Sequence, residues 1–322
     1  MDKVLAVDLG GTKIYSALVG RGGEIICEDK CLTGPEKGVE AVIERITNSL
    51  KCVCPACEQP LGIGVAVPAY IDSEKGVILF APNLKWRDVD LKRALEESFN
   101  LPVWMDNDAN LAALGEHRYG AGRGYHDLVY ITVSTGVGGG LILNNQLYRG
   151  AFGGAGEFGH MIVDAHGPIC SCGNKGCLEG LASGCAIMRD ARDLVRSDRG
   201  KGILAAAEGI EGVDACAVGK AALEGDPEAK EILIAAGRHL GRAIASVANL
   251  LNPELFIIGG GVACGVGELL LEPAYDEAYR RTYPPYREQL KIIPAALKGR
   301  SGLLGAAAYA WDQLQQGNPS GD

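Results

Sequence analysis

The sequence predicts a mixed α/β protein with two domains. Its 322 residues, 47% of them hydrophobic, suffice for one large or two medium globular cores. Apolar runs of strand length alternate along the chain with segments of helical hydrophobic spacing. One plan also occurs twice, because an apolar run ends in a glycine-rich turn and leads into a hairpin at residues 3–27 and again at residues 128–148. We therefore expect two domains rather than one.

The first half of the chain mixes strands and helices. Hydrophobic periodicity and turn residues define each element. The last strand of this half delivers Asp106, Asn107 and Asp108 at its end. The expected elements are strands at 3–8, 14–19 and 24–27, a helix at 36–51, a strand at 61–67, a strand at 77–80 continuing the same sheet, a loop at 83–86, a helix at 91–99 and a strand at 103–105.

The second half opens with the repeated plan and then becomes mostly helical. A strand at 128–134 meets the glycine-rich turn 135–140, and the hairpin 141–148 turns at Asn144 and Asn145. The remaining expected elements are helices at 181–195, 215–223 and 227–251, a strand at 255–258, a helix at 267–279, a strand at 291–293 and a closing helix at 302–314. This closing helix is expected to pack back onto the first domain.

A glycine-rich loop at 153–179 concentrates groups that bind metals. Cys170, Cys172 and Cys177 have C-x-C-x4-C spacing, and His160 lies ten residues before the first of them. One imidazole and three thiolates suit tetrahedral Zn²⁺, and the glycines between the cysteines permit a tight turn. Reduced thiols without metal are the plainer alternative, but spacing, glycines and histidine together favour zinc. Because these four ligands fill a tetrahedral site, the zinc is expected to be structural.

The glycine turns are candidate phosphate sites. Backbone N–H groups in a concave turn bind phosphate, and each of the first two turns carries a hydroxyl residue, Thr12 or Thr135. A pair of ordinary hairpins is the alternative, which their repetition disfavours. The chain has neither the G-x4-G-K-[ST] pattern of a P-loop nor a complete dinucleotide fingerprint, so the hairpin turns are the better candidates.

Composition limits the class of partner. A formal net charge of −9 and a pI near 5.2 disfavour a general nucleic-acid surface or an anionic membrane surface. The chain shows neither a membrane-length apolar run nor a signal peptide at its start, which predicts a cytoplasmic protein that handles small molecules. Eleven cysteines, an odd number, fit reduced thiols and one metal site better than a disulfide framework.

Six motifs together resemble the ROK family of sugar kinases and sugar-responsive repressors. They are DLGGTK at 8–13, DNDAN at 106–110, STGVGGG at 134–140, GEFGH at 156–160, CSCGNKGCLE at 170–179 and GGGV at 259–262. The resemblance extends from residue 4 to about residue 310, and the cysteine motif with its preceding Gly-His is the most specific part. It implies an actin-like (ribonuclease H-like) two-domain sugar kinase fold with a central cleft, in which ATP and a hexose meet.

The resemblance also assigns domains and nucleotide-binding residues. It implies a small N-terminal α/β domain at 1–108, joined by the C-terminal helix 302–322, and a large α/β domain at 109–301 with the zinc loop at 160–177. Phosphate charge would be neutralised by turn N–H groups, Mg²⁺ and Lys13. The implied ATP-binding residues are Asp8, Gly10, Gly11, Thr12 and Lys13 in the first turn, Thr135, Gly136, Gly138 and Gly139 in the second, and Gly259, Gly260 and Gly261 in the third.

For the sugar, the resemblance implies that Asp108 is the catalytic base that accepts the proton of the 6-hydroxyl. The implied hexose ligands are Asn83, Asn107, Asp108, Glu157, His160 and Glu179, with the second ring nitrogen of His160 on zinc. The adjacent Asp106 is interpreted as a structural acid that caps the following helix.

Two features depart from this pattern or lie outside it. Ala69 occupies a position where the family usually has glycine, so its methyl group is expected either to crowd the sugar or to forbid a positive φ. Cys52, Cys54 and Cys57 form a second close trio without a histidine, and solvated or half-buried thiols are favoured there over a metal site.

The predicted function is ATP-dependent phosphorylation of a hexose at its 6-hydroxyl, with glucose to glucose 6-phosphate first. N-acetylhexosamine, mannose, allose and fructose stay open as substrates, as do other phosphate donors, including polyphosphate. A sugar-sensing transcriptional regulator is the main alternative, disfavoured because the first strand begins at residue 3 and leaves no room for a DNA-binding domain. A zinc-stabilised interaction module would leave the glycine turns without a role. A homodimer is expected from the resemblance.

Overall fold

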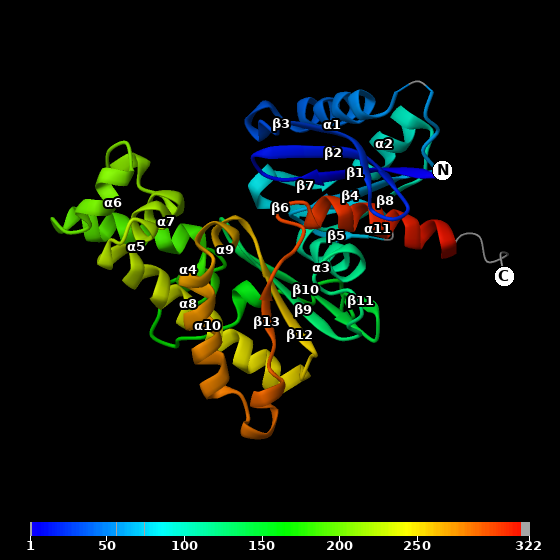
Figure 1. The fold of residues 1–322 in the computed structure, drawn as a ribbon. Helices are drawn as coiled ribbons and strands as arrows, with labels where there is room; N and C mark the ends of the chain where they lie inside the picture. The colour runs from blue at the N-terminus through cyan, green and yellow to red at the C-terminus, as the bar shows by residue number, and fades with distance from the viewer. Residues whose placement is uncertain (1, 56, 74, 317–322) are drawn as a thin grey trace. The chain divides into compact units, whose positions relative to one another are not determined.

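The computed structural model covers residues 1–322 and describes all of them except 1, 56, 74 and 317–322 (Figure 1). The described residues form two compact units. Unit 1 consists of the described residues within Met1–Gly124, Gly140–Ala155 and Arg300–Asp322, and unit 2 of Tyr125–Gly139 and Gly156–Gly299. The domain boundaries expected from the sequence, 1–108 with 302–322 and 109–301, stay a prediction.

The main sheet of unit 1 has the strand order β3-β2-β1-β4-β8. The first three strands pair antiparallel, whereas β1, β4 and β8 run parallel, so their carboxyl ends meet at one edge. Every residue of β4 is buried. The strands are β1 (Lys3–Leu9), β2 (Lys13–Gly20), β3 (Ile25–Leu32), β4 (Ile63–Val67) and β8 (Val103–Asn107), and the helices are α1 (Val39–Val53), α2 (Leu91–Phe99) and α3 (Asp108–Tyr119), with a 3-10 turn η1 (Pro35–Lys37).

A separate three-stranded sheet corrects two expectations. Val77–Ala81 forms β6, which lies between β5 (Tyr70–Asp72) and β7 (Trp86–Val89) and is not part of the main sheet. The segment expected to be a loop at 83–86 is a 3-10 turn, η2 (Pro82–Leu84), followed by β7. Trp86 is only 2% exposed and anchors this strand. Short connections join these strands in sequence, and β6 pairs antiparallel with both β5 and β7.

The second five-stranded sheet repeats the first, which confirms the predicted repeat. Its order is β11-β10-β9-β12-β13, with the β10–β11 hairpin antiparallel and β9, β12 and β13 parallel. Asn144 and Asn145 both have positive φ in the hairpin turn, as a two-residue type I′ connection requires. The strands are β9 (Leu128–Val133), β10 (Val137–Leu143), β11 (Gln146–Tyr148), β12 (Leu255–Gly259) and β13 (Ile292–Pro294).

The helices of unit 2 largely follow the prediction. α8 begins at Pro227 behind the capping side chain of Asp226, and α10 packs closely against it because Gly237 and Gly241 leave room for backbone contact. The short helices α6 (Lys201–Ala206) and α9 (Gly261–Val266) were not expected. The other elements are η3 (Phe158–His160), α4 (Glu179–Ala182), α5 (Gly184–Arg196), η4 (Ile210–Gly212), α7 (Ala215–Leu223), α8 (Pro227–Leu251), α10 (Glu268–Arg281) and η5 (Pro284–Gln289).

The closing helix α11 (Ser301–Gln316) lies against β4, β1 and α3 within unit 1 (Figure 1). Small residues allow this approach. A Cβ on Gly64 would lie 1.9 Å from the carbonyl oxygen of Ala306, and one on Gly305 would lie 1.6 Å from that of Leu111. Among the described helices, none has the length and apolar character needed to cross a bilayer.

Candidate active site and metal centre

The first glycine turn joins β1 to β2 and closes on itself. The N–H of Gly10 donates to the carbonyl of Lys13 at 2.9 Å, so this amide is not left free as the sequence interpretation assumed. Thr33, the residue after β3, supports the turn, since its hydroxyl donates to the carbonyl of Gly10 at 2.6 Å and its N–H to that of Thr12 at 2.9 Å. Sequence reasoning missed Thr33, because nothing in the local pattern connects it to a turn more than twenty residues away.

The second turn is shorter than expected. Gly138 and Gly139 lie in strand β10, not in the turn, which corrects their assignment as turn residues. The reason is packing, because a Cβ on Gly139 would lie 2.2 Å from the ring of Phe158 and 2.7 Å from the carbonyl oxygen of Tyr130. Ser134 and Thr135 instead face the start of α5, where their carbonyls accept the N–H groups of Gly184 and Cys185.

Glu179 connects this turn to the cysteine loop. One of its carboxylate oxygens accepts the N–H of Val137 at 3.1 Å and would lie 2.6 Å from a Cβ on Gly136. The other accepts the hydroxyl of Ser171 at 3.2 Å. The predicted phosphate turn and a predicted sugar ligand are thus in direct contact within unit 2, and glycine at 136 leaves space for that carboxylate.

The third glycine run is a strand-to-helix junction. Gly259 ends β12, Gly260 has φ of 93°, and Gly261 begins α9. A Cβ on Gly260 would lie 2.3 Å from the carbonyl oxygen of Val133, so both backbone conformation and space require glycine.

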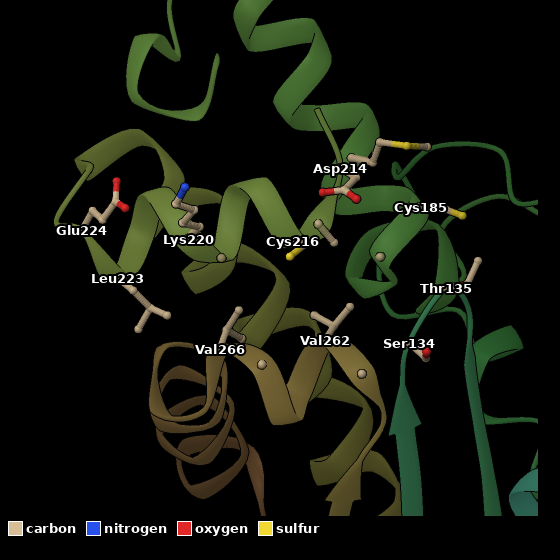
Figure 2. A pocket seen from close by; sticks show the side chains of 16 residues that line it. Ser134, Thr135, Cys185, Asp214, Cys216, Lys220, Leu223, Glu224, Val262 and Val266 are labelled. Atoms are coloured by element: carbon tan, nitrogen blue, oxygen red, sulfur yellow. The ribbon is translucent and has the colours of Figure 1, made fainter. Parts of the chain in front are cut away.

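A cavity of about 650 Å³ lies between the second turn and the third junction (Figure 2). Figure 2 shows Ser134 and Thr135 on one side, Cys216 and Lys220 on α7 with Asp214 and Glu224 at its two ends, and Val262 and Val266 on α9. The volume lies within the range of small-molecule sites. Its apolar walls with a few polar groups suit a flat base that has a polar, charged attachment. Apart from residues of the two glycine runs, the sequence interpretation named none of its lining residues, because they come from four separate segments.

The predicted zinc ligands converge. Ligand atoms of His160, Cys170, Cys172 and Cys177 all lie within 4.8 Å of one another, and this is the one such group found among the described residues. The two sulfurs of Cys172 and Cys177 are 3.7 Å apart, close to the edge of a tetrahedron with Zn–S bonds of about 2.3 Å. Gly173 and Gly176 have positive φ, as the tight turn requires.

The electrostatics of the cluster also fit a cation. Burial, and then the neighbouring sulfurs of Cys172 and Cys170, raise the pKa of the Cys177 thiol to about 12. Three thiolates would therefore not coexist here without a compensating positive charge, which Zn²⁺ supplies when it is bound. The geometry and donor set thus fit structural zinc, with these four side chains as ligands.

His160 has its two ring nitrogens on different sides. Its Nδ1 is 3.8 Å from the sulfur of Cys170, whereas its Nε2 is 4.0 Å from a carboxylate oxygen of Glu157. A nitrogen that binds metal leaves the other as an N–H donor toward a carboxylate or hydroxyl. The half-exposed Nε2 and the exposed Glu157 are therefore positioned as a hydroxyl-binding pair.

The predicted base lies at the carboxyl edge of the main sheet in unit 1. Asp108 is the first residue of α3, and Asn107 caps the helix by accepting the N–H groups of Ala109 and Asn110. The amide of Asn107 also donates to the carbonyl of Ala69 at 3.3 Å. Burial, and then the charge of Asp108, raise the pKa of Asp8 to about 7. Two carboxyl groups therefore lie near each other here.

Asp106 does not cap α3, which corrects its predicted role. Its carboxylate is buried, pairs with Arg149 Nε at 2.5 Å and accepts the Asn110 side-chain amide at 3.0 Å. The neighbouring Asn107 has the extended backbone and the side-chain geometry of the cap. Sequence reasoning missed Arg149.

The remaining predicted positions are Asn83, Ala69 and the trio Cys52, Cys54 and Cys57. Asn83 is exposed in η2, and its Cβ would be 3.3 Å from a Cβ on Gly11, so it lies beside the first turn. Ala69 is absent from the residues with positive φ, so its methyl group does not strain the backbone. Cys52, Cys54 and Cys57 do not form a metal-binding group, and burial raises the pKa of the Cys54 thiol.

Comparison with known proteins extends these observations over nearly the whole chain. A glucokinase from Streptomyces coelicolor is 35% identical over 315 residues, which cover 96% of this chain and 98% of that one. A xylose repressor from Caldicellulosiruptor bescii is 36% identical over 312 residues, covering 95% of this chain and 77% of the repressor.

Among solved structures, a ROK family glucokinase from Streptomyces griseus in complex with glucose and AMPPNP aligns with a TM-score of 0.87. It is 37% identical and covers 96% of this chain and 99% of its own. The predicted mixed α/β fold of the actin-like sugar kinases is thereby confirmed. The model of the ROK family matches residues 4–313, and the chain belongs to the ROK family.

Proposed function

We propose that this protein is an ATP-dependent hexose kinase that phosphorylates the 6-hydroxyl of its sugar, with glucose as the preferred substrate. The observation that carries the proposal is the placement of Asp108 at the start of α3, at the carboxyl edge of the sheet, in a chain similar throughout to a glucokinase solved with glucose and AMPPNP. Mannose, allose, fructose and N-acetylhexosamine are the substrates to compare.

In this proposal the residues divide into a sugar group and a phosphate group. Asp108 accepts the proton of the 6-hydroxyl, while Asn107 offers its second amide hydrogen, since the first is donated to Ala69. Glu157, Glu179 and the Nε2 of His160 bind the other hydroxyls. Asn83 is proposed as a further sugar ligand.

The phosphates of ATP are proposed to lie along the first two turns, and the base and ribose in the cavity beside Thr135 and Gly261. Mg²⁺, when bound with ATP, neutralises phosphate charge, and Lys13 adds a further positive charge next to the first turn. Zinc would hold the loop of His160 and Cys170–Cys177 in place, through the four converging ligands described above.

A regulatory role is the second candidate, because a xylose repressor is as similar in identity as the glucokinases. The enzyme is favoured because Asp108 is present at the start of α3 and because the similar S. griseus glucokinase was solved with glucose and AMPPNP. A homodimer and a cytoplasmic location are further parts of the proposal. Light scattering on the purified protein tests the dimer.

The deciding experiment is a coupled kinase assay over the five sugars, with ATP and Mg²⁺ and with polyphosphate as an alternative donor. We expect the highest kcat/KM for glucose with ATP. Asp108→Asn should lower kcat by at least ~10²–10⁴-fold, the usual contribution of a positioned base, while glucose binding survives. A wild-type protein that binds a hexose without phosphorylating it would favour the regulator, and an active Asp108→Asn variant would exclude Asp108 as the base.

A further inference from the structure

Arg149 and Asp106 form the most deeply buried ion pair near the proposed base, and the proposed function gives neither a role. The carboxylate of Asp106 is 6% exposed and the guanidinium of Arg149 is 29% exposed. Arg149 also lies over the ring of Tyr309, with its central carbon 5.1 Å from the ring centroid. A charge this buried is costly to leave unpaired, so the pair has a demanding geometry.

Asp106 connects this ion pair to the start of α3 through hydrogen bonds. The carboxylate oxygen that does not face Arg149 accepts the N–H of Asn107 at 2.7 Å and the side-chain amide of Asn110 at 3.0 Å. Asn107 in turn caps α3. The first turn of the helix, which carries Asp108, is therefore held by the cap and, through Asp106, by the guanidinium of Arg149.

Asn110 shows how specific this arrangement is. The residue is 2% exposed, and its Oδ1 has no hydrogen-bond partner in the structure. Its amide group can face Asp106 only with the NH₂ toward the carboxylate, because two oxygen acceptors would repel each other. The buried charge of Asp106 thus selects the orientation of a side chain in the first turn of α3.

The backbone of Arg149 has a second connection. Its carbonyl accepts the N–H of Ala155 at 3.0 Å, which closes a loop in which Gly150 and Gly153 have positive φ. The hydroxyl of Tyr70 donates to the carbonyl of Phe152 at 3.1 Å and attaches this loop to β5. Glu157, a proposed sugar ligand, follows two residues after the closing hydrogen bond.

We infer that Arg149 is a positioning residue that sets the base through Asp106 and α3. The inference rests on the proposed function. A displacement of about 1 Å in reacting groups costs ~10²-fold in rate, so a modest shift of α3 has a measurable effect.

The test compares Arg149→Met with Arg118→Met in the hexose kinase assay. Arg118 lies on α3 in unit 1, away from Asp106, and pairs with Asp312 of α11 at 2.6 Å. Its substitution therefore controls for the loss of one charge and one ion pair. We expect Arg149→Met to lower kcat/KM for glucose by ~10²-fold, with most of the loss in kcat, while KM for ATP changes less than about twofold. Arg118→Met should stay within about twofold for both substrates.

Two further variants keep the test decisive. Arg149→Lys restores the charge with a single contact to Asp106 and should recover part of kcat. Asp106→Asn should cause a loss that is not additive with that of Arg149→Met, because both variants act through the same ion pair. If Arg149→Met does not fold, Arg149→Lys and Asp106→Asn take its place. A folded Arg149→Met with kcat and KM for glucose like those of Arg118→Met overturns the inference alone, whereas a wild type without hexose kinase activity overturns the proposed function as well.

Discussion

Asp8 and Asp108 bring two carboxyl groups close together at the ends of β1 and β8. Burial and the charge of Asp108 raise the pKa of Asp8 from 3.8 to about 7. A carboxyl group with a raised pKa keeps its proton in the folded state and loses it in the unfolded state. Its contribution to stability is therefore fully present below pH 3.8 and is lost as the pH rises through about 7.

The direction of this pH dependence can be measured with Asp8→Asn, which keeps the shape of the side chain and removes its titration. In Mg²⁺-free buffer, the free energy of unfolding of the wild type relative to Asp8→Asn should fall as the pH rises from 4 to 8. Urea unfolding at intervals of half a pH unit gives the difference. A difference that does not change across this range would show that Asp8 titrates normally.

The cysteine loop is the element with the strongest predicted dependence on a metal. Zinc sites in small domains contribute on the order of 10 kcal/mol to folding, but in a chain with two cores the effect of loss should be local. Cys172→Ala is expected to disorder the loop that carries Glu157 and Glu179 and to abolish sugar phosphorylation, while much of the fold remains. Cys52→Ala, which also removes an exposed thiol, is the matched control.

Metal analysis and chelation complete that test. About one zinc per chain is expected in the wild type and in Cys52→Ala, and none in Cys172→Ala. Glucose binding should be lost when a chelator removes the metal and should return when zinc is added. Metal-free protein that binds and phosphorylates hexose normally would contradict the structural role.

Two helices around the cavity carry exposed cysteines whose alkylation can measure nucleotide binding. Cys185 on α5 and Cys216 on α7 are exposed and line the proposed nucleotide pocket, whereas Cys52 and Cys57 are exposed in unit 1 (Figure 2). A bound nucleotide should therefore slow alkylation of the first two by iodoacetamide at least about tenfold, because they are covered, and leave the other two unchanged. Mass spectrometry with and without AMPPNP measures each site. Equal labelling of Cys185 and Cys216 in both samples would place the nucleotide elsewhere.

At the scale of the whole molecule, unit 1 is assembled from the beginning and the end of the chain. α11 contributes buried residues from Ser301 to Trp311 and lies against β1, β4 and α3. The contact depends on glycines that admit backbone atoms, above all Gly305 against the carbonyl of Leu111. Loss of this contact would expose the apolar face of β4, whose residues are all buried.

Gly305→Ala is therefore expected to destabilise the protein by about 1–3 kcal/mol, the usual cost of overpacking, despite the higher helix propensity of alanine. Gly154→Ala is the control, because no atom lies within 4 Å of the added Cβ and its φ is not in the positive range. It should leave the melting temperature nearly unchanged. A melting temperature of Gly305→Ala at or above that of the wild type would show that α11 can shift without cost.

The sequence alone determined most elements and the local constellations. Helices α2, α7 and α8 were predicted at their observed bounds, because hydrophobic spacing and capping residues act within a few turns. The zinc ligands were predictable because all four lie between residues 160 and 177, so their spacing in the chain nearly defines their spacing in space. The glycine turns and Asp108 were visible for the same reason.

Only the tertiary structure decided what depends on contacts between distant segments. Arg149 and Asp106 are 43 residues apart, and no local pattern records that their side chains meet. The cavity is lined by four segments between Ser134 and Val266, and the strand at Val77–Ala81 pairs with β5 and β7 instead of joining the main sheet. Gly138 and Gly139 looked like turn residues but lie in β10, where Gly139 leaves room for the ring of Phe158. Alternation and spacing encode which face of an element is buried, whereas its neighbours are selected by the packing of the whole chain.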